Sequence, residues 1–197
     1  MITIGIPKSE KMPDKNISKE HNLFLKEMIN EIKNNGNLKD DFNKKYKSFD
    51  KESYQKKYIE EKTNIKIKKS KKAFIIEKCQ YKETNIKTFD GECVYKDNYL
   101  FFIMKITDGN LESETVGGGH QGNVKNEIIS TIKTAIYYIK KENKEKFVFV
   151  LDGQFWHKSM INSILKRTNY DKYNNIIVGC TPKIIKKIEE MDNKNGK

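Results

Sequence analysis

Three short, almost continuously apolar segments in the second half of the chain constrain its fold most strongly. These segments, and the helical patterns that follow each of them, span residues 99–107, 124–142, 147–151, 158–168, 176–180 and 182–191. Short apolar runs bounded by polar residues are typical of buried strands. Strands that alternate with helices indicate an α/β fold. The sequence therefore predicts an α/β domain in which helices flank a central sheet.

Two further strand candidates precede these segments, at residues 73–80 and 86–95. The segment Lys96-Asp97-Asn98 after the second candidate has turn composition, so residues 86–95 and 99–107 are predicted to form an antiparallel hairpin. A right-handed crossover through the helix at 124–142 would follow the hairpin. The predicted sheet is therefore mixed.

The first 72 residues differ in composition, because Lys, Asn and Glu dominate them. Apolar residues recur at helical spacing over 19–33, and residues 39–62 are compatible with a polar helix. The aromatic residues expected on the inner face of the second helix are Phe42, Phe49, Tyr54 and Tyr58. We therefore divide the chain into a basic, mostly helical N-terminal region (1–72), an α/β core (73–192) and a polar tail (193–197).

The formal net charge is +12. Such a charge favours polyanionic partners and accelerates encounter with them. A base-composition bias in the encoding genome is an equally good explanation for so many lysines. The basic run at 66–72 is either a solvated face or a surface that follows phosphates. Charge supports a nucleic-acid partner without establishing one.

Cys79, Cys93 and Cys180 lie in apolar, strand-like runs, and none has CxxC spacing. Buried free thiols in a reducing cytosol are the expectation, rather than a cysteine nucleophile or a zinc site. The chain has no apolar stretch of about 18 residues and no signal-peptide core at its N-terminus. We therefore expect a cytoplasmic protein.

The predicted hairpin carries the best candidates for catalysis. Asp90 lies within the second strand candidate, and Lys105 ends the apolar run Leu-Phe-Phe-Ile-Met. Neighbouring strands can bring both side chains to one edge of the sheet. A carboxylate can hold a divalent ion that activates water, and an ammonium can orient that water or neutralise phosphate charge. Taken singly, Asp90 could merely form a turn with Gly91, and Lys105 could merely extend its charged end into solvent.

A glycine-rich segment leads directly into the helix predicted at 124. Its glycines, Gly118 and Gly119 among them, would let the backbone approach a phosphate, and a helix N-terminus favours anions. The polar residues His120, Gln121 and Asn123 could reach the edges of DNA bases. The alternative is a flexible connection in which Asn123 is the helix N-cap.

Residues 86–180 resemble type II restriction endonucleases of the PD-(D/E)xK superfamily, most nearly the EcoRI/MunI-like branch. Phe89-Asp90-Gly91 falls where the family has Pro-Asp, and Ile103-Met104-Lys105 falls where it has Glu-x-Lys. Gly122-Asn123 before a helix, and a strand that ends in Asp152-Gly153, also match the family's order.

The resemblance implies a restriction-endonuclease-like core and a role for each matching residue. Asp90 would bind Mg²⁺, and Lys105 would act on the attacking water. His120, Gln121, Asn123 and Lys125 would be candidates for DNA recognition. The partner would be double-stranded DNA, and a homodimer would match a palindromic site.

Ile103 is a serious departure, because it stands where the family has its second metal-binding carboxylate. We prefer a relocated carboxylate, with Glu127 early in the following helix as the catalytic and metal-binding substitute. Another source would be a Glu of the N-terminal helices, such as Glu60 or Glu61, and Glu92 or Glu77 would belong to the site if the alignment is shifted. A protein that binds DNA without cutting it is the third explanation.

The resulting hypothesis is a sequence-specific, Mg²⁺-dependent type II restriction endonuclease. Two alternatives stay open. A DNA-binding protein with a degenerate nuclease core would show salt-sensitive binding without cleavage. A basic RNA-binding module would prefer RNA and would be indifferent to Asp90.

Overall fold

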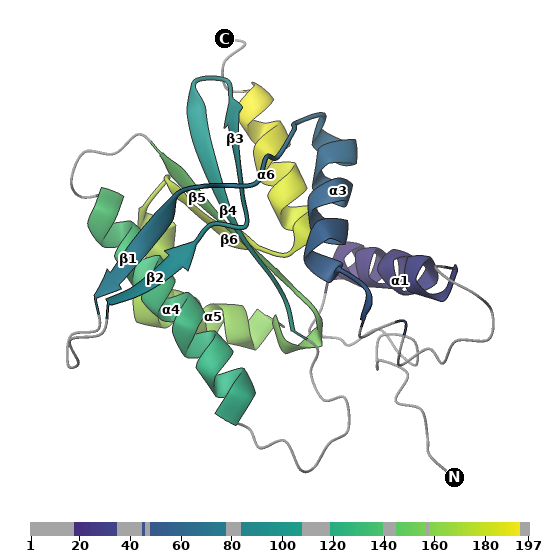
Figure 1. Ribbon diagram of the computed structural model, residues 1–197, viewed down its shortest axis with the longest axis horizontal. Helices are drawn as coiled ribbons and strands as arrows, with labels where there is room; N and C mark the ends of the chain where they lie inside the picture. The colour runs from purple at the N-terminus through teal and green to yellow at the C-terminus, as the bar shows by residue number, and fades with distance from the viewer. Residues whose placement is uncertain are drawn as a thin grey trace.

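The computed structural model describes residues 18–34, 45, 48–77, 84–107, 119–139, 145–156 and 158–193. These residues form an α/β fold (Figure 1). The elements in chain order are α1 (Lys19–Asn34), α3 (Lys51–Thr63), β1 (Ala73–Glu77), β2 (Thr84–Thr88), β3 (Gly91–Tyr95), β4 (Asn98–Ile106), α4 (Gly119–Ile139), β5 (Lys146–Asp152), η2 (Gln154–Trp156), α5 (Lys158–Thr168), η3 (Tyr170–Lys172), β6 (Ile176–Gly179) and α6 (Thr181–Asn193).

The central sheet has four strands in the order β3-β4-β5-β6. β3 and β4 are antiparallel, whereas β4, β5 and β6 are parallel. Lys96 and Asp97, which connect β3 to β4, both have positive φ, as a two-residue type I′ hairpin turn requires. The predicted hairpin and mixed sheet are therefore confirmed.

Helices cover both faces of this sheet, because its strands alternate apolar side chains to either side. On one face, Phe101, Ile103 and Phe149 pack against α4 and α5. On the other face, Phe102 and Met104 pack in a second cluster that contains residues of α3 and α6. The sheet is thus the middle layer of three, with α4 and α5 on one side and α3 and α6 on the other (Figure 1).

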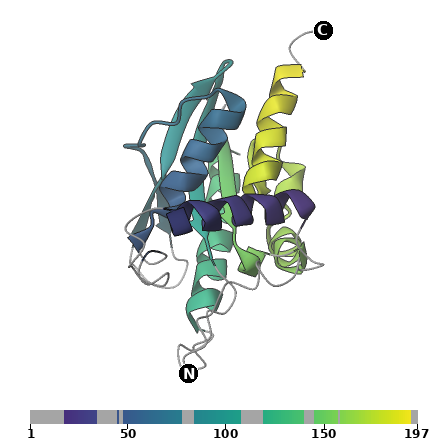
Figure 2. The same ribbon diagram turned by 90° about the vertical axis from the view of Figure 1, so that its right-hand side faces the viewer.

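The N-terminal helices pack directly on this core. Ile59 of α3, together with Ile65 and Ile67 just beyond it, belongs to the same buried cluster as β4 and β5. α1 lies across α3 and α6 (Figure 2). Phe24 of α1 contacts the rings of Tyr54 and Tyr58, while Phe49 contacts Tyr54. The predicted aromatic face is confirmed for Tyr54 and Tyr58 of α3. Phe49 also packs against this cluster but lies before the helix begins, and Phe42 lies outside the described residues.

The prediction of one strand over residues 86–95 was wrong. The chain leaves β2 at Thr88 and re-enters a different sheet at Gly91. Among the described strands, β1 and β2 pair only with each other, as an antiparallel pair next to α4 (Figure 1). A Cβ on residue 91 would clash with the side chain of Ile67, so glycine lets the 67–68 segment cross here. Asp90 consequently lies in a bend between two sheets.

Two predicted helix boundaries also moved. α3 begins at Lys51 because Asp50 caps it, accepting a hydrogen bond from the Ser53 backbone N–H at 2.9 Å. α4 begins at Gly119, five residues before the predicted start, so Asn123 lies inside the helix and is not its N-cap. Of the helices described, none is long and apolar enough to cross a membrane.

Gly153→Ala should destabilise the fold by at least about 2 kcal/mol. Gly153 has φ of +100°, and an added Cβ would collide with the Thr107 carbonyl group. Gly179→Ala is the matched control, because its Cβ would meet the flexible side chain of Lys183. Urea unfolding of both variants checks the expectation. Equal losses would mean that the left-handed backbone at Gly153 is not the cause.

Candidate active site

The candidate site forms where β4 runs past the end of β3. Gly91, the first residue of β3, pairs with Phe102 of β4. Asp90 continues along the same edge: its backbone N–H donates to the Phe102 carbonyl at 2.9 Å. Its Oδ2 accepts a hydrogen bond from the Met104 backbone N–H at 2.7 Å. The Asp90 carboxylate is therefore held beside the residue that precedes Lys105.

Lys105 ends the apolar part of β4 and is partly buried. Its Nζ lies 3.0 Å from Oε1 of Glu52, in the first turn of α3. These two residues are 53 positions apart in the chain, and the packing of α3 on β4 brings them together. Sequence reasoning missed Glu52. Its position after the Asp50 cap is typical of an acidic residue that only favours the helix N-terminus.

Nearby carboxylates change the pKa of Lys105. Burial by itself would lower the pKa of Lys105, but the negative charges of Glu52, Asp90 and Glu127 outweigh burial and raise it. The side chain therefore stays an ammonium throughout the neutral range. Such a group can orient a water molecule or neutralise phosphate charge, but it cannot accept a proton as a general base.

Glu127 lies in the third turn of α4 with an exposed side chain, and its negative charge makes the smallest contribution of the three carboxylates to the raised pKa of Lys105. The site thus combines Asp90 and Lys105, predicted together, with Glu127, the predicted substitute, and with Glu52. Among the described residues, these carboxylates do not form a group of three whose oxygen atoms all lie within 4.8 Å of one another. Mg²⁺ does not require such contact, because it usually keeps several waters and uses one or two carboxylates.

Ile103 lies in the core rather than in this site. Its side chain is 1% exposed and belongs to the cluster on the α4 face. Three of the other carboxylates considered from sequence are engaged elsewhere. Glu60 accepts a hydrogen bond from the Ile67 backbone N–H, Glu92 accepts one from the Ser70 hydroxyl, and Glu61 lies 3.7 Å from Lys57. Glu77 is the last residue of β1, opposite Thr84 in the separate sheet.

The candidate DNA-binding residues are only partly described. Gly118 and the side chains of His120 and Gln121 lie outside the described residues, and Gly119 is the first residue of α4. Asn123 is exposed one turn into the helix. Lys125 donates from Nζ to the Ser163 hydroxyl of α5 at 2.9 Å. In this structure the Lys125 ammonium therefore serves the contact between α4 and α5.

A second polar cluster lies deeper, at the carboxyl ends of β5 and β6. Asp152 was predicted only to open a turn, yet its side chain is fully buried. It accepts hydrogen bonds from Gln55 Nε2 at 2.6 Å, from the Thr181 backbone N–H at 3.0 Å and from Thr181 Oγ1 at 2.6 Å. His21 Nε2 lies 2.9 Å from Asp152 Oδ1, the oxygen that also accepts from the Thr181 backbone N–H. No pattern in the sequence predicts this cluster, because its members come from four segments.

Cys93 and Cys180 are free cysteines, and Cys79 lies outside the described residues. Burial raises the pKa of both thiols to about 11, with a smaller contribution from Glu60 at Cys93 and from Asp152 at Cys180. Both are therefore protonated at neutral pH, which does not suit a cysteine nucleophile.

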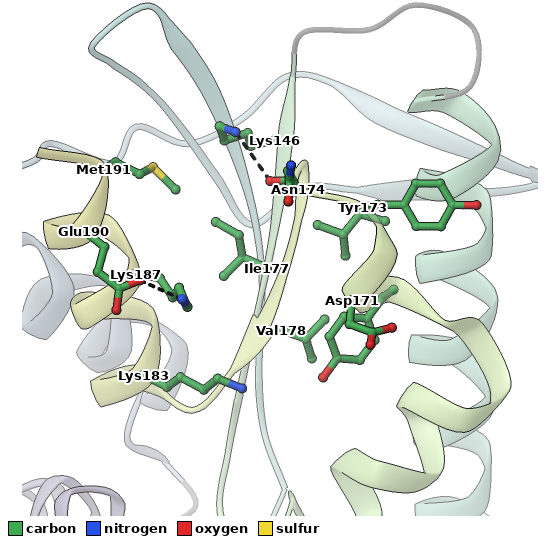
Figure 3. A pocket seen from close by; sticks show the side chains of 12 residues that line it. Lys146, Asp171, Tyr173, Asn174, Ile177, Val178, Lys183, Lys187, Glu190 and Met191 are labelled. Carbon is green, nitrogen blue, oxygen red and sulfur yellow. Dashed lines mark hydrogen bonds and ion pairs between the residues drawn. The ribbon is translucent and has the colours of Figure 1, made fainter. Parts of the chain in front are cut away.

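A pocket of about 510 Å³ lies along the edge strand β6, between α6 and the segment of η3 (Figure 3). Charged residues line it, and Lys187 pairs with Glu190 across 2.6 Å within α6. It contains none of the predicted site residues. The pocket is therefore separate from the cluster around Lys105.

Comparison with known proteins gives no match: no family model, no curated protein and no solved structure matches the chain. The chemistry of this site therefore rests on its own residues.

Proposed function

We propose that this protein is a Mg²⁺-dependent endonuclease that hydrolyses phosphodiester bonds of double-stranded DNA, as a type II restriction enzyme with a restriction-endonuclease-like core. One observation carries the proposal. The Lys105 ammonium near the end of β4 lies 3.0 Å from the Glu52 carboxylate, and the Asp90 carboxylate accepts a hydrogen bond from the adjacent Met104 N–H at 2.7 Å. The sequence hypothesis expects this kind of arrangement, with Lys105 close to carboxylates at one edge of the mixed sheet.

The donor set suits Mg²⁺, a hard cation that prefers carboxylate and water oxygens. Asp90, with Glu52 or Glu127, would hold the ion. When bound, Mg²⁺ would supply an activated water and stabilise charge on the phosphate. The Met104 N–H orients Asp90 through its 2.7 Å hydrogen bond. Lys105, kept protonated by its neighbours, would stabilise charge on the reacting phosphate rather than accept a proton.

The net charge of +12 supports a polyanionic partner. Asn123 is exposed in the N-terminal half of α4, which also contains Glu127. We therefore assign the start of α4 to DNA contact, with His120, Gln121 and the glycines before them as further candidates. A homodimer that reads a palindromic site completes the proposal, and light scattering of the purified protein tests it.

The decisive test is a digest of methylation-free plasmid and phage DNA with Mg²⁺ or with EDTA. Discrete fragments that require Mg²⁺ are expected. Asp90→Asn should lower the cleavage rate by at least about 100-fold. The substitution removes the carboxylate charge but keeps an oxygen that can accept from the Met104 N–H.

Asp97→Asn is the matched control, since Asp97 is exposed in the β3–β4 turn and asparagine tolerates its positive φ. It should cleave like the wild type. Salt-sensitive retention of duplex DNA without cleavage would favour the binding-only alternative. A preference for RNA that is insensitive to Asp90 would overturn the proposal.

A further inference from the structure

The cluster around Asp152 contains three different kinds of metal ligand. Asp152 is the last residue of β5, Cys180 directly follows β6, and His21 lies in the first turn of α1. The imidazole Nε2, the carboxylate oxygen and the thiol sulfur all lie within 4.8 Å of one another. His21 and Asp152 are both buried, and Cys180 is half-buried.

Two polar atoms of this cluster lack a hydrogen-bond partner among the described residues. His21 Nε2 lies 2.9 Å from Asp152 Oδ1 but makes no hydrogen bond to a described residue. Gln55 Oε1 is also buried without a partner, although its amide nitrogen donates to Asp152. Leaving a buried polar atom unsatisfied costs about 1–3 kcal/mol. Two such atoms beside one thiol indicate that a further group completes the cluster.

We propose that His21 Nε2, Asp152 and Cys180 Sγ bind a divalent cation of the zinc class. Nitrogen, oxygen and sulfur donors together suit Zn²⁺, which is usually four-coordinate in proteins. Gln55 Oε1 or a water supplies the fourth donor. Ligands at roughly 2.0–2.3 Å from a tetrahedral metal lie roughly 3.3–3.8 Å apart. The three ligand atoms, all within 4.8 Å of one another, would therefore shift by up to roughly one ångström on binding.

Binding would replace the thiol proton of Cys180 with the metal, so that one proton is released to solvent and no redox change occurs. The absence of CxxC spacing argued against zinc at the level of sequence. That argument covers ligands that are close in the chain, whereas these come from α1 and from the ends of β5 and β6. The thiolate and imidazole distinguish this site from the all-carboxylate site at Lys105, which suits Mg²⁺.

The location gives the site a structural consequence. The backbone of Asp152 also links the ends of β4 and β5. Its carbonyl accepts from the Thr107 N–H, and Asp152 lies opposite Ile106 in register. A metal here would join α1 to the strands that support Lys105. We therefore expect metal binding to raise the melting temperature by several degrees, since a ligand that binds only the folded chain stabilises it.

The test is titration of the metal-free full-length protein with Co²⁺, followed by displacement with Zn²⁺. One Co²⁺ per chain is expected, with a near-ultraviolet absorption band that reports sulfur–cobalt bonding. Cys180→Ser should abolish that band and weaken Co²⁺ binding at least about tenfold. His21→Gln should weaken binding to a similar extent. Circular dichroism confirms that each variant is folded.

Cys93→Ser is the matched control, because Cys93 is a buried free cysteine in the other part of the core, next to Ile67 and Leu100. Cys93→Ser and Cys79→Ser should keep the band. Absence of the band in the wild type, or its survival in Cys180→Ser, would overturn the proposal. Neither result bears on DNA cleavage, so this site and the nuclease site are tested separately.

Discussion

Glu52→Gln is expected to reduce the rate of DNA cleavage by at least about 100-fold while leaving the fold intact. Glu52 is the residue whose oxygen contacts Lys105 Nζ, and its charge helps to raise the pKa of Lys105. Glutamine keeps the shape and an acceptor oxygen but removes the charge. Single-turnover cleavage with saturating enzyme and Mg²⁺ measures the loss, and melting temperatures measure the fold.

Glu61→Gln is the matched control on the same helix, where Glu61 faces Lys57 on the exposed surface. It should cleave at the wild-type rate. If Glu52→Gln also cleaves normally while Asp90→Asn does not, Glu52 only pairs with Lys105 and Glu127 is the second functional carboxylate. If both variants cleave normally, the site is not catalytic.

The parts of the fold that follow local patterns could be predicted from sequence. The continuous apolar runs at β4, β5 and β6 marked their strands, and the Lys96-Asp97 turn marked the β3–β4 hairpin. The break between β2 and β3 could not be predicted in the same way. Phe89 contacts Phe101 in the core, so the apolar pattern continues through the point where the chain changes sheets. Only the close crossing of Ile67 over Gly91 reveals the break.

Sequence reasoning could identify only the candidate site residues that belong to, or directly follow, the predicted hairpin. Asp90, just before β3, is hydrogen-bonded to Met104, the residue before Lys105 in the neighbouring strand β4, and Glu127 belongs to the helix that comes next in the chain. Glu52 could not be found, because the packing of α3 on the sheet decides its place. The contact between His21 and Asp152 could not be predicted for the same reason, because it joins α1 to β5 across 131 positions of the chain.

Ile103→Glu is expected to destabilise the protein by more than about 4 kcal/mol and not to increase cleavage. Sequence alone makes this substitution attractive, since it would restore the family's Glu-x-Lys order. In the structure, however, Ile103 lies opposite Phe149 in the parallel register and is 1% exposed within the apolar cluster under α4. A carboxylate there would lose its hydration without gaining a charged partner.

Ile103→Val separates packing from charge, because removing one buried methylene should cost only about 1 kcal/mol. Urea unfolding of the two variants gives the comparison, and cleavage is measured under conditions where each is folded. A folded Ile103→Glu variant with faster cleavage would contradict the structure at this strand, because position 103 would then face the metal. If Ile103→Glu loses stability without a gain in cleavage, and Ile103→Val cleaves at the wild-type rate, position 103 serves the core. The second carboxylate then lies outside β4, and Glu52, 3.0 Å from Lys105 Nζ, is the nearest candidate with a direct contact.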